Sequence, residues 1–565
     1  MRRGEDHKMA EMGKYINPGM AYFDFSRRDD FVDKSELIHL INQKKINTKG
    51  GLMLVSRPRR FGKTLAAEML SAYYGSGYDA RPLFEGLKIA ELDPTLVNLN
   101  SFNVLYLDIS DLWRDVTAFQ KKEDRKNQSG KKPLVQLDWI WKLEEWIEAE
   151  LIKIFGEEVE GSTFFETLEK VVKKDGKKFF WICDEWDMFF REDCPDTKAA
   201  ANYIELLRGL FKAGGGYTQR VFAGAYMTGI LPMVKTKGQS AVSDFNIFSM
   251  IQPLDFAPYF GFTENEVKDI CEKSGMDFEE MKNWYDGYQI GELTSLFNPK
   301  SVRLAVGNRD CEAYWNDSSS YESLAACIIV NVDGIREAVE NLLRGQSIDI
   351  EPNAFENDLH KLNTRNEILG AMVHLGYLTY DRVTRTVRIP NLEVRKVFLQ
   401  AIENHNYEDT FRRIKAADQL LLDTWRGDSR AVEKEIEKVH AKWGDPKHYN
   451  SEARLSEVVS TAYLTAENYY VKFYELGAGI GFVDLAFIPK PGKNVLPMVV
   501  ELKWEKPVKA GLQQIKEKRY IDKVRDFAYK GDVVLVGITY NSSAEGKDVK
   551  KHTCVIEKVN LDLRS

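Results

Sequence analysis

The chain has 565 residues, of which 44% are hydrophobic and 29% are charged, and its formal net charge is −7 at pH 7. This length exceeds one hydrophobic core and predicts three or four domains, and the composition is that of a globular protein and excludes a disordered one. The negative charge excludes a general attraction to nucleic acid, so any such site must be a local basic patch.

The cysteines and the apolar segments restrict the cellular compartments in which we expect this protein. The six cysteines are scattered, with no C-x-x-C pair, so neither a disulfide framework nor a zinc site is indicated. No apolar segment reaches the ~18 residues of a membrane span, and Met1–Met12 is polar and charged, unlike a signal peptide. We therefore expect a cytoplasmic protein without a membrane partner.

Residues 1–14 are expected to be a flexible leader. The aromatic segments Tyr22–Phe25 and Phe31–Lys34 then lead into an amphipathic stretch, Leu37–Ile41. Such an element before the first strand can pack over a nucleotide base or can belong to the ordinary core. The sequence leaves both possibilities open.

A phosphate-binding loop is the strongest motif of the chain. The apolar run Leu52–Val55 predicts a buried strand, and a polar turn leads to Gly62-Lys63-Thr64 and a helix over Leu65–Tyr74. In such a loop the helix N–H groups face an anion, the lysine reaches the outer phosphates and the threonine hydroxyl binds Mg²⁺. The motif departs from G-x-x-x-x-G-K-[ST] at its first glycine, which is Arg57 here. The alternative is a lysine at a helix start that binds nothing.

The arginines of this loop repel one another unless an anion or an acidic side chain offsets their charge. We expect at least one of Arg57, Arg59 and Arg60 to contact nucleotide phosphate or an acidic residue such as Asp187.

Three features follow in chain order. Asn103–Ile109 predicts a second strand. Residues 120–132 have many charges and no apolar periodicity, which predicts a mobile surface loop, with contact between its lysines and a phosphate backbone as the alternative. A tryptophan-rich amphipathic helix is expected over Leu137–Phe155.

Two further strands end in polar residues. Lys178–Cys183 predicts a buried parallel strand whose carboxyl end carries Asp184 and Glu185. In an ATPase the aspartate holds the Mg²⁺ shell and the glutamate polarises the attacking water. Arg220–Ile230 predicts a fourth strand, in which Thr228 either senses the γ-phosphate or merely ends the strand.

These motifs resemble the AAA-ATPase-like family, whose Arg57-type loop is the family's own form and which usually has tyrosine at the position of Trp186. The resembling segments are Ser56–Thr64, Asp184–Asp187, Thr228–Ile230, Phe245–Ile247, Gly261–Val267, Trp284–Tyr288 and Asn298–Ser301. The resemblance implies ATP and Mg²⁺ as cofactors, Glu185 at the attacking water, and a homo-oligomer as a possible assembly. The nucleotide-binding residues it implies are Arg59, Arg60, Gly62, Lys63, Thr64, Leu65, Asp184 and Thr228, with Thr64 and Asp184 at the metal.

The segment after residue 315 turns helical and charged. His374–Asp381, Arg385–Asn391 and Leu392–Phe398 predict a helix, a β-hairpin and a returning helix, which suggests a winged-helix-like module. Such a module can touch DNA, but acidic residues dilute the basic ones here, so a joining role is preferred.

A second group of chemically active residues lies near the C-terminus. After an expected helix over Glu452–Tyr463, a strand over Gly479–Ile488 carries Asp484, and a second strand carries Glu501 and Lys503 on one face because side chains alternate. Hairpin pairing brings Asp484 beside them. Two carboxylates suit Mg²⁺ or Mn²⁺, and the ammonium can position or deprotonate water. The alternative is an exposed, salt-bridged hairpin.

This arrangement resembles the PD-(D/E)xK nuclease superfamily, a domain that AAA-ATPase-like proteins commonly carry at their C-terminus. The resemblance implies Asp484 and Glu501 as metal ligands and Lys503 as the catalytic lysine, with Gln514 and Tyr520 on the following helix. Glu452 matches the acidic residue of the preceding helix, although Glu457 competes for that role.

Together these inferences predict an α/β protein with a P-loop NTPase domain, a parallel sheet flanked by helices. The predicted segments are a leader (1–14), an AAA-like P-loop ATPase domain (15–300), a helical and winged-helix-like connector (301–445) and a PD-(D/E)xK nuclease-like domain (446–565). The expected function is ATP-regulated, Mg²⁺-dependent cleavage of nucleic acid, with DNA preferred over RNA. The alternative is a nucleotide-switch signalling or remodelling ATPase whose C-terminal domain binds nucleic acid without cutting it.

Overall fold

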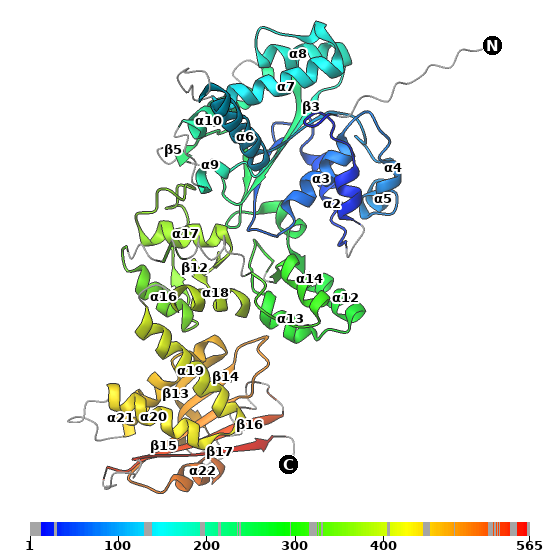
Figure 1. The fold of residues 1–565 in the computed structure, drawn as a ribbon. Coiled ribbons are helices and arrows are strands. Elements are labelled where there is room, and N and C mark those ends of the chain that lie inside the picture. Colours follow the sequence, from blue (N-terminus) through cyan, green and yellow to red (C-terminus); the bar gives the residue numbers. More distant parts are fainter. Residues whose placement is uncertain are drawn as a thin grey trace. The chain divides into compact units, whose positions relative to one another are not determined.

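The computed structural model divides the chain into two compact units (Figure 1). The first comprises Met1–Phe278, Tyr285–Cys311 and Asp349–Val387, and the second comprises Glu279–Trp284, Glu312–Ile348 and Arg388–Ser565. The structure describes residues 13–27, 31–128, 138–192, 198–212, 216–233, 235–236, 239–293, 295–315, 325, 327–328, 332–403, 407–443, 452–478, 481–517, 524, 527, 529, 531–542 and 551–561. The predicted segments were defined by sequence motifs, whereas these two units are defined by contacts between residues. The predicted domain boundaries therefore stay predictions.

A five-stranded parallel sheet forms the centre of the first unit. Its strands, in spatial order, are β2 (Asn103–Asp108), β3 (Phe179–Asp184), β4 (Phe222–Gly229), β1 (Leu52–Ser56) and β7 (Asn246–Phe248). The strands read as apolar runs because both faces are buried. The four predicted strands are confirmed, except that Arg220 and Val221 belong to a short helix, α11 (Tyr217–Val221).

Helices cover both faces of this sheet. On one face, α1 (Ala21–Ser26), α2 (Glu36–Lys44) and α3 (Lys63–Tyr74) share a core with alternate strand residues such as Met53, Val55, Phe180, Ile182 and Tyr226. On the other face lies α10 (Ala199–Phe211), where Phe211 packs edge-on against Trp181 and Tyr203 contacts the Cys183 thiol. The layers are therefore those of an α/β fold.

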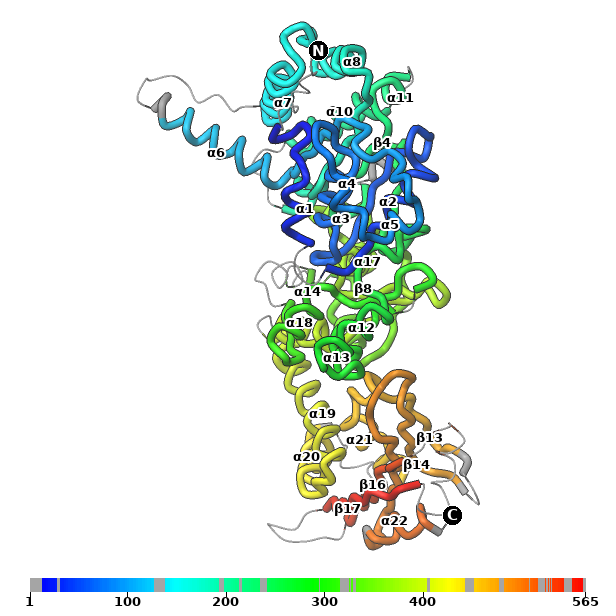
Figure 2. The backbone as a smooth tube through the Cα atoms, turned by 90° about the vertical axis from the view of Figure 1, so that its right-hand side faces the viewer, coloured from blue at the N-terminus to red at the C-terminus, as the bar shows by residue number. Residues whose placement is uncertain are grey.

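One expectation is wrong in the segment after β2. Helix α6 runs from Ile109 to Gln128 as a single rod, so residues 120–128 are helical and do not form a surface loop (Figure 2). Its charged residues lack apolar periodicity because this part of the helix has little core to cover. The rest of the expected loop, residues 129–132, lies outside the described residues. The predicted tryptophan-rich helix follows as α7 (Trp139–Phe155), capped by Asp138.

Capping residues fix the starts of three of the remaining helices of the first unit. Thr263 and Thr364 form capping boxes at α12 and α17, and Asn298 caps α14 ahead of Pro299. The elements are α4 (Arg81–Phe84), α5 (Lys88–Leu92), η1 (Glu157–Val159), α8 (Phe164–Asp175), α9 (Met188–Arg191), β5 (Lys235–Thr236), β6 (Gln239–Ser240), η2 (Leu254–Tyr259), β8 (Phe262–Thr263), α12 (Glu264–Ser274), β9 (Leu296–Phe297), α14 (Pro299–Asn308), α17 (Arg365–Leu375), β11 (Thr379–Asp381) and β12 (Thr386–Arg388).

The predicted helix, hairpin and returning helix are present. They are α17, the neighbouring strands β11 and β12, and α18 (Leu392–Glu403). Helix α17 ends where Gly376 takes φ +88°, a left-handed value that turns the chain into the hairpin.

The second unit contains a mixed sheet in sequential order. It consists of β13 (Tyr470–Ala478), β14 (Gly481–Pro489), β15 (Met498–Trp504), β16 (Asp532–Tyr540) and β17 (His552–Asn560). Only β15 and β16 are parallel, and α22 (Val508–Glu517) lies in the connection between them. Leu512 and Ile515 of α22 pack on one face, whereas α20 (Ser429–Trp443) and α21 (Glu452–Ala462) pack on the other.

The other elements of the second unit are α13 (Phe278–Tyr285, which begins and ends in the first unit), α16 (Ile335–Leu343), β10 (Ile348–Asp349), α19 (Glu408–Arg426) and η3 (Ala466–Asn468). Within the described part of the chain, none of the helices combines the length and apolar character that a membrane span requires.

Candidate functional site

The polar residues that follow the parallel strands meet at one edge of the first sheet. Asp108 ends β2 and Asp184 ends β3, and the two are partners in the parallel register. Ser56 ends β1, which leads into the phosphate-loop motif. Carboxyl ends of parallel strands mark the ligand crevice in open α/β sheets, so this edge is the first candidate site.

The loop after β1 has the backbone form of an anion site. Gly62 takes φ +88° and N-caps α3, and Arg60 takes φ +71°, a left-handed value that costs a non-glycine residue energy. Helix α3 thus begins with its N–H groups toward the loop. Lys63 is 5% exposed, and its ammonium donates to the carbonyl of Pro58 at 3.0 Å.

A pocket of about 920 Å³ opens over this loop. Phe31 and Val32 line it, whereas Phe23 lies in the core, so the two aromatic segments before β1 have different roles. Its remaining lining residues are Lys34, Arg59, Arg60, Phe61, Gly62, Lys63, Thr64, Leu65, Ala66, Met69, Asp108, Ser110, Trp113, Glu185, Met188, Arg191, Glu192, Tyr259, Gly261, Phe262, Pro299, Lys300 and Arg303.

Asp184 lies beneath the loop. The side chain is fully buried, which raises its pKa to about 7, while the Thr64 hydroxyl acts to lower it. Its Oδ1 accepts the Glu185 N–H at 2.9 Å, and its Oδ2 accepts no well-formed hydrogen bond from the described residues. A buried carboxylate oxygen beside a threonine hydroxyl is a donor set that fits Mg²⁺. Burial likewise lowers the pKa of Lys63, against the opposing effect of Glu185 and Asp184.

Arg191, on α9, is a site residue that the sequence analysis missed. Its guanidinium pairs with Glu185 Oε2 and lies 3.6 Å from Asp187 Oδ2. Glu185 itself takes φ +53°, so its backbone is strained at the end of the strand. The spacing of Asp187 and Arg191, four residues apart, could have indicated a helical ion pair.

The other two residues of the Asp-Glu-Trp-Asp motif brace the segment after β4. Asp187 Oδ2 accepts the N–H groups of Ile230 and Leu231 at 3.0 and 2.7 Å, and the Trp186 indole donates to the Leu231 carbonyl at 2.9 Å. A Cβ on Gly229 would lie 2.5 Å from Asp187 Oδ1 and 2.6 Å from the Trp186 ring. The motif and the end of β4 therefore fit only with glycine there.

The three loop arginines have separate surroundings. Arg57 donates to the carbonyls of Ser56 and Phe248, each at 2.8 Å. Its side chain is fully buried, and this burial lowers its pKa to about 9. Arg59 pairs with Glu192 at 3.3 Å, which confirms that an acidic residue offsets part of this charge. Of the arginines in the described chain, it is Arg191, outside the loop, that pairs with Asp187.

Thr228 and Asp184 do not line the pocket. Thr228 is fully buried, and its carbonyl accepts the Trp186 N–H at 3.1 Å. Arg59, Arg60, Gly62, Lys63, Thr64, Leu65 and Glu185 do line it. Direct contact between Thr228 and a nucleotide stays a prediction.

The second candidate site lies on strands β14 and β15. The Lys503 ammonium donates to Glu501 Oε1 at 2.9 Å, and the Gln514 amide of α22 donates to the same oxygen. Asp484 Oδ2 accepts the Leu502 N–H at 2.7 Å. Asp484, Glu501, Lys503 and Gln514 thus come together, and burial raises the pKa of Asp484.

Lys503 stays a cation in this setting. Burial alone would lower its pKa, but the hydrogen bond and charge of Glu501 outweigh burial and raise it. A protonated lysine can orient water and neutralise a phosphate, whereas a base must first lose its proton. The retained charge is consistent with the positioning role, and the role of Lys503 itself stays a prediction.

Glu452 and Glu457, the two candidates for the helix-borne acidic residue, both lie on α21 but have different partners. Glu452 Oε1 lies 4.0 Å from the Lys503 ammonium and accepts the Trp504 N–H at 3.3 Å. Glu457 instead pairs with Arg454 and is mostly exposed. The helix position thus brings Glu452, rather than Glu457, to this group. Tyr520 lies outside the described residues.

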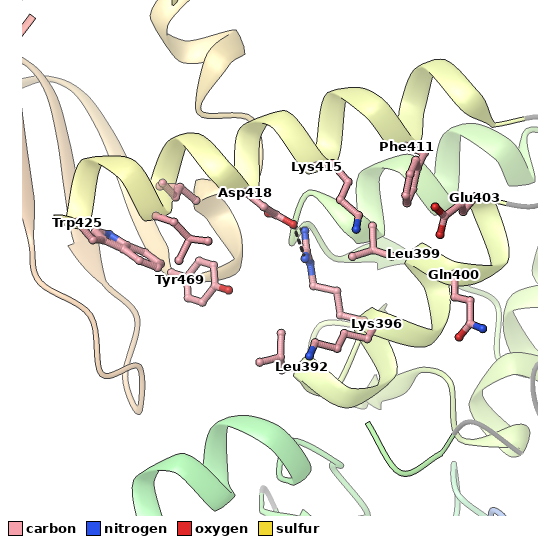
Figure 3. Close-up of a pocket in the computed structure, with 13 residues that line it drawn as sticks. Leu392, Lys396, Leu399, Gln400, Glu403, Phe411, Lys415, Asp418, Trp425 and Tyr469 are labelled. Atoms are coloured by element: carbon pink, nitrogen blue, oxygen red, sulfur yellow. Dashed lines mark hydrogen bonds and ion pairs between the residues drawn. The ribbon is translucent and has the colours of Figure 1, made fainter. Parts of the chain in front are cut away.

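A hollow of about 360 Å³ between α18 and α19 is lined by none of the predicted site residues (Figure 3). The Arg395 guanidinium forms two hydrogen bonds with Asp418 there, at 2.8 and 3.0 Å. Its walls mix this ion pair with apolar side chains and with the polar side chains of Lys396, Gln400, Glu403 and Lys415, and we interpret it as part of the helix packing.

Comparison with known proteins indicates the kind of domain that holds the first candidate site. Residues 19–237 match a family model described as "Predicted AAA-ATPase" and thus form an AAA-ATPase-like domain. The chain is also similar to a protein of Azotobacter chroococcum mcd 1, named "Uncharacterized protein in vnfD 5'region". The two are 23% identical over 558 residues, which cover 90% of this chain and 93% of that protein.

Proposed function

We propose that this chain binds and hydrolyses ATP with Mg²⁺ at the loop between β1 and α3. Support comes from the AAA-ATPase-like match over residues 19–237 and from a pocket that Lys63, Thr64 and Glu185 all line. The pocket can take a nucleotide of several hundred Å³, with the phosphates at the α3 N-terminus.

The roles of the chain's own residues follow from their chemistry. Lys63 neutralises the outer phosphates, and Thr64 and Asp184 would hold Mg²⁺, which when bound offsets phosphate charge. Glu185 orients the attacking water once its carboxylate leaves Arg191. Phe31 and Val32 offer an apolar wall to the base.

Phosphate release from ATP tests this proposal. Lys63→Ala should abolish turnover and weaken nucleotide binding, because the phosphate charge loses its main neutralising side chain. Lys173→Ala, which removes a lysine from the exposed surface of α8, is the matched control and should leave turnover unchanged. If Lys63→Ala hydrolyses ATP at a rate close to that of the unmutated chain, the assignment of Lys63 to the nucleotide phosphates is wrong.

A second pair of variants separates Glu185 from Asp184. Glu185→Gln should bind ATP and fail to hydrolyse it, whereas Asp184→Asn should lose Mg²⁺-dependent binding. Equilibrium binding of a labelled nucleotide, with and without Mg²⁺, measures the difference. If Glu185→Gln binds ATP far more weakly yet hydrolyses it at a normal rate, the two roles are wrongly assigned.

For the second unit we propose Mg²⁺-dependent cleavage of DNA phosphodiesters, regulated by the ATPase. The observation that carries this proposal is the convergence of Asp484, Glu501 and Lys503 on adjacent strands. Two carboxylates fit Mg²⁺ or Mn²⁺ as donors, and the retained charge of Lys503 suits a group that faces the scissile phosphate. Gln514 would hold the Glu501 carboxylate in place.

Plasmid nicking in Mg²⁺, with and without ATP, tests the nuclease proposal. Asp484→Asn and Glu501→Gln should lose metal affinity as well as rate, whereas Lys503→Ala should lose rate alone. Ca²⁺ should not replace Mg²⁺, because its longer and looser coordination positions water poorly. Lys516→Ala, a half-exposed lysine of α22, is the control.

The alternative is a nucleotide-switch or remodelling ATPase whose second unit binds nucleic acid without cutting it. The contacts of Glu501 with Lys503 and Gln514 favour this alternative, since a carboxylate so engaged can be structural. If Lys503→Ala nicks DNA as fast as the unmutated chain, the nuclease proposal is wrong and this alternative takes its place.

A further inference from the structure

A cluster of two histidines and a glutamate lies on the second unit, and none of the three belongs to the sites assigned above. Glu437 and His440 are three residues apart on α20 and therefore share one face of the helix. His552 is the first residue of β17, and one potential ligand atom from each of the three residues lies within 4.8 Å of the others. We propose that His440 and His552, with Glu437 holding the His552 ring from behind, bind a divalent transition metal ion of the zinc class, which fastens α20 to β17.

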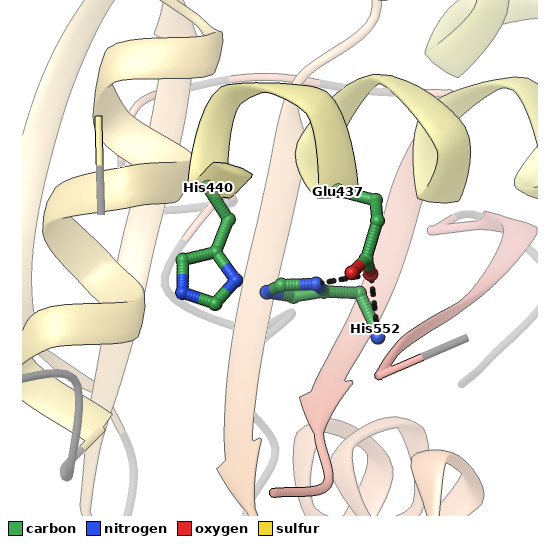
Figure 4. A group of neighbouring side chains, drawn as sticks. All are labelled: Glu437, His440 and His552. Carbon is green, nitrogen blue, oxygen red and sulfur yellow. Dashed lines mark hydrogen bonds and ion pairs between the residues drawn. The ribbon is translucent and has the colours of Figure 1, made fainter. Parts of the chain in front are cut away.

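The contacts of Glu437 orient the His552 ring. Glu437 Oε2 accepts from His552 twice, from the backbone N–H at 3.0 Å and through the ring Nδ1 at 2.6 Å. Figure 4 shows the other ring nitrogen of His552 turned toward the His440 ring. A carboxylate behind one imidazole nitrogen is the usual partner of a histidine whose second nitrogen ligates a metal.

The two imidazoles are packed against each other. Their centroids are 5.0 Å apart at an interplanar angle of 79°, and the Tyr540 ring contacts both. A neutral imidazole presents one lone pair to a metal, so two neighbouring rings can hold one ion between them.

The scaffold holds the ligands in register. His552 pairs with Tyr540 at the end of β16, and Ser429 at the start of α20 accepts the Ile556 N–H of β17 at 3.0 Å. Buried Val432 and Ile436 fix the helix on the sheet between those points. Ligands on a tetrahedral zinc ion lie about 3.4 Å apart, and His440 is partly exposed, so its ring can rotate toward the second ring nitrogen of His552.

The donor set separates this site from the two sites proposed above. Two imidazole nitrogens favour zinc, cobalt or nickel, whereas Mg²⁺ prefers oxygen ligands. A solvent-facing position at His440 leaves room for water as a further ligand. Titration of Zn²⁺ or Co²⁺ in excess Mg²⁺ therefore reports on this cluster.

The test is a Zn²⁺ titration of the full chain after chelation and dialysis, in excess Mg²⁺, with bound metal measured directly and Co²⁺ used for its absorption spectrum. One tightly bound ion per chain is expected. His440→Asn should weaken it by more than the ~10–100-fold that loss of an outer-shell partner costs, and Glu437→Gln by about that range, because Glu437 orients the His552 ring. His360→Asn, which removes an exposed histidine, should not change it.

The choice of variant, one further variant and a second measurement keep the test decisive. His552 is fully buried, so His552→Asn can fail to fold, and His440→Asn carries the result because His440 is partly exposed. Asp484→Asn should keep the zinc ion. Bound zinc should also slow hydrogen exchange of the β17 amides. Tight binding that survives in His440→Asn, binding that is lost in Asp484→Asn instead, or no tight binding at all would overturn the proposal.

Discussion

Arg191 is the residue on which the acidic cluster of the first site depends. It is 5% exposed and pairs with Glu185, and its Nε lies 3.6 Å from fully buried Asp187. Burial raises the pKa of Asp187, and the positive charge of Arg191 acts against that rise. A single side chain therefore stabilises one buried carboxylate, Asp187, and forms an ion pair with a second, Glu185.

We predict that Arg191→Ala lowers the free energy of unfolding by about 3 kcal/mol, because it leaves a buried carboxylate unpaired. Denaturant unfolding measures this change. Adding Asp187→Asn should recover part of the loss, since the pair is then removed together. A loss below about 1 kcal/mol in the single variant would contradict a buried ion pair.

Glu144 of α7 gives a prediction with a defined pH window. Partial burial, then Glu148 and Asp138, raise its pKa to about 7. Between about pH 4.5 and pH 7 the unfolded chain releases this proton while the folded chain keeps it, so stability falls as pH rises. Glu144→Gln should therefore stabilise the chain at pH 8 and have little effect at pH 4.5. Equal denaturation midpoint shifts at both pH values would contradict it.

At the scale of elements, the end of β4 and the segment after β3 are fitted to each other. The Asp187 carboxylate and the Trp186 indole occupy the space beside Gly229 and bond to the two residues after it. This packing fixes the carboxyl ends of β3 and β4, and Glu185, which lines the candidate nucleotide pocket, directly follows β3. A change here should reach the site through the backbone.

Gly229→Ala should destabilise the chain by about 1–3 kcal/mol and reduce ATP turnover, because its Cβ would meet Asp187 Oδ1 at 2.5 Å. Gly307→Ala is the matched control. Gly307 lies inside α14 with no atom within 4 Å of its Cβ position, so alanine should stabilise by about 0.5–1 kcal/mol. Thermal unfolding of both variants measures the effect, and loss of stability in neither or in both would refute the packing argument.

At the scale of the whole molecule, the two proposed activities use different compact units. The residues of the nucleotide site belong to the first unit, and Asp484, Glu501 and Lys503 belong to the second. Any influence of ATP on DNA cleavage must then act between units, which is a coupling free energy rather than a shared site.

Single substitutions should therefore separate the activities. Lys503→Ala should keep ATP turnover and lose cleavage, whereas Lys63→Ala should lose turnover and, with it, the effect of ATP on cleavage. Phosphate release and plasmid nicking measured on the same preparations test this. Loss of both activities in each variant, with the fold intact by circular dichroism, would point to one composite site.

Local pattern alone predicted a large part of this molecule. The strand, loop and helix around Lys63, the acidic end of β3 and the shared face of Glu501 and Lys503 all depend on neighbours within a few residues, where strand and helix periods act directly. The charged stretch at 120–128 was mispredicted as a loop, because charge without apolar periodicity does not exclude a helix that has little core to cover.

The tertiary structure decided what depends on distant segments. Sequence order does not say that β4 lies between β1 and β3, that Thr228 is buried beneath the pocket surface, or that Glu452 rather than Glu457 approaches Lys503. Glu437 and His552 are 115 residues apart, and only the packing of α20 on β17 brings them into contact. Such pairs form because burial of apolar faces fixes which elements meet, and that free energy belongs to the whole core and not to any single segment.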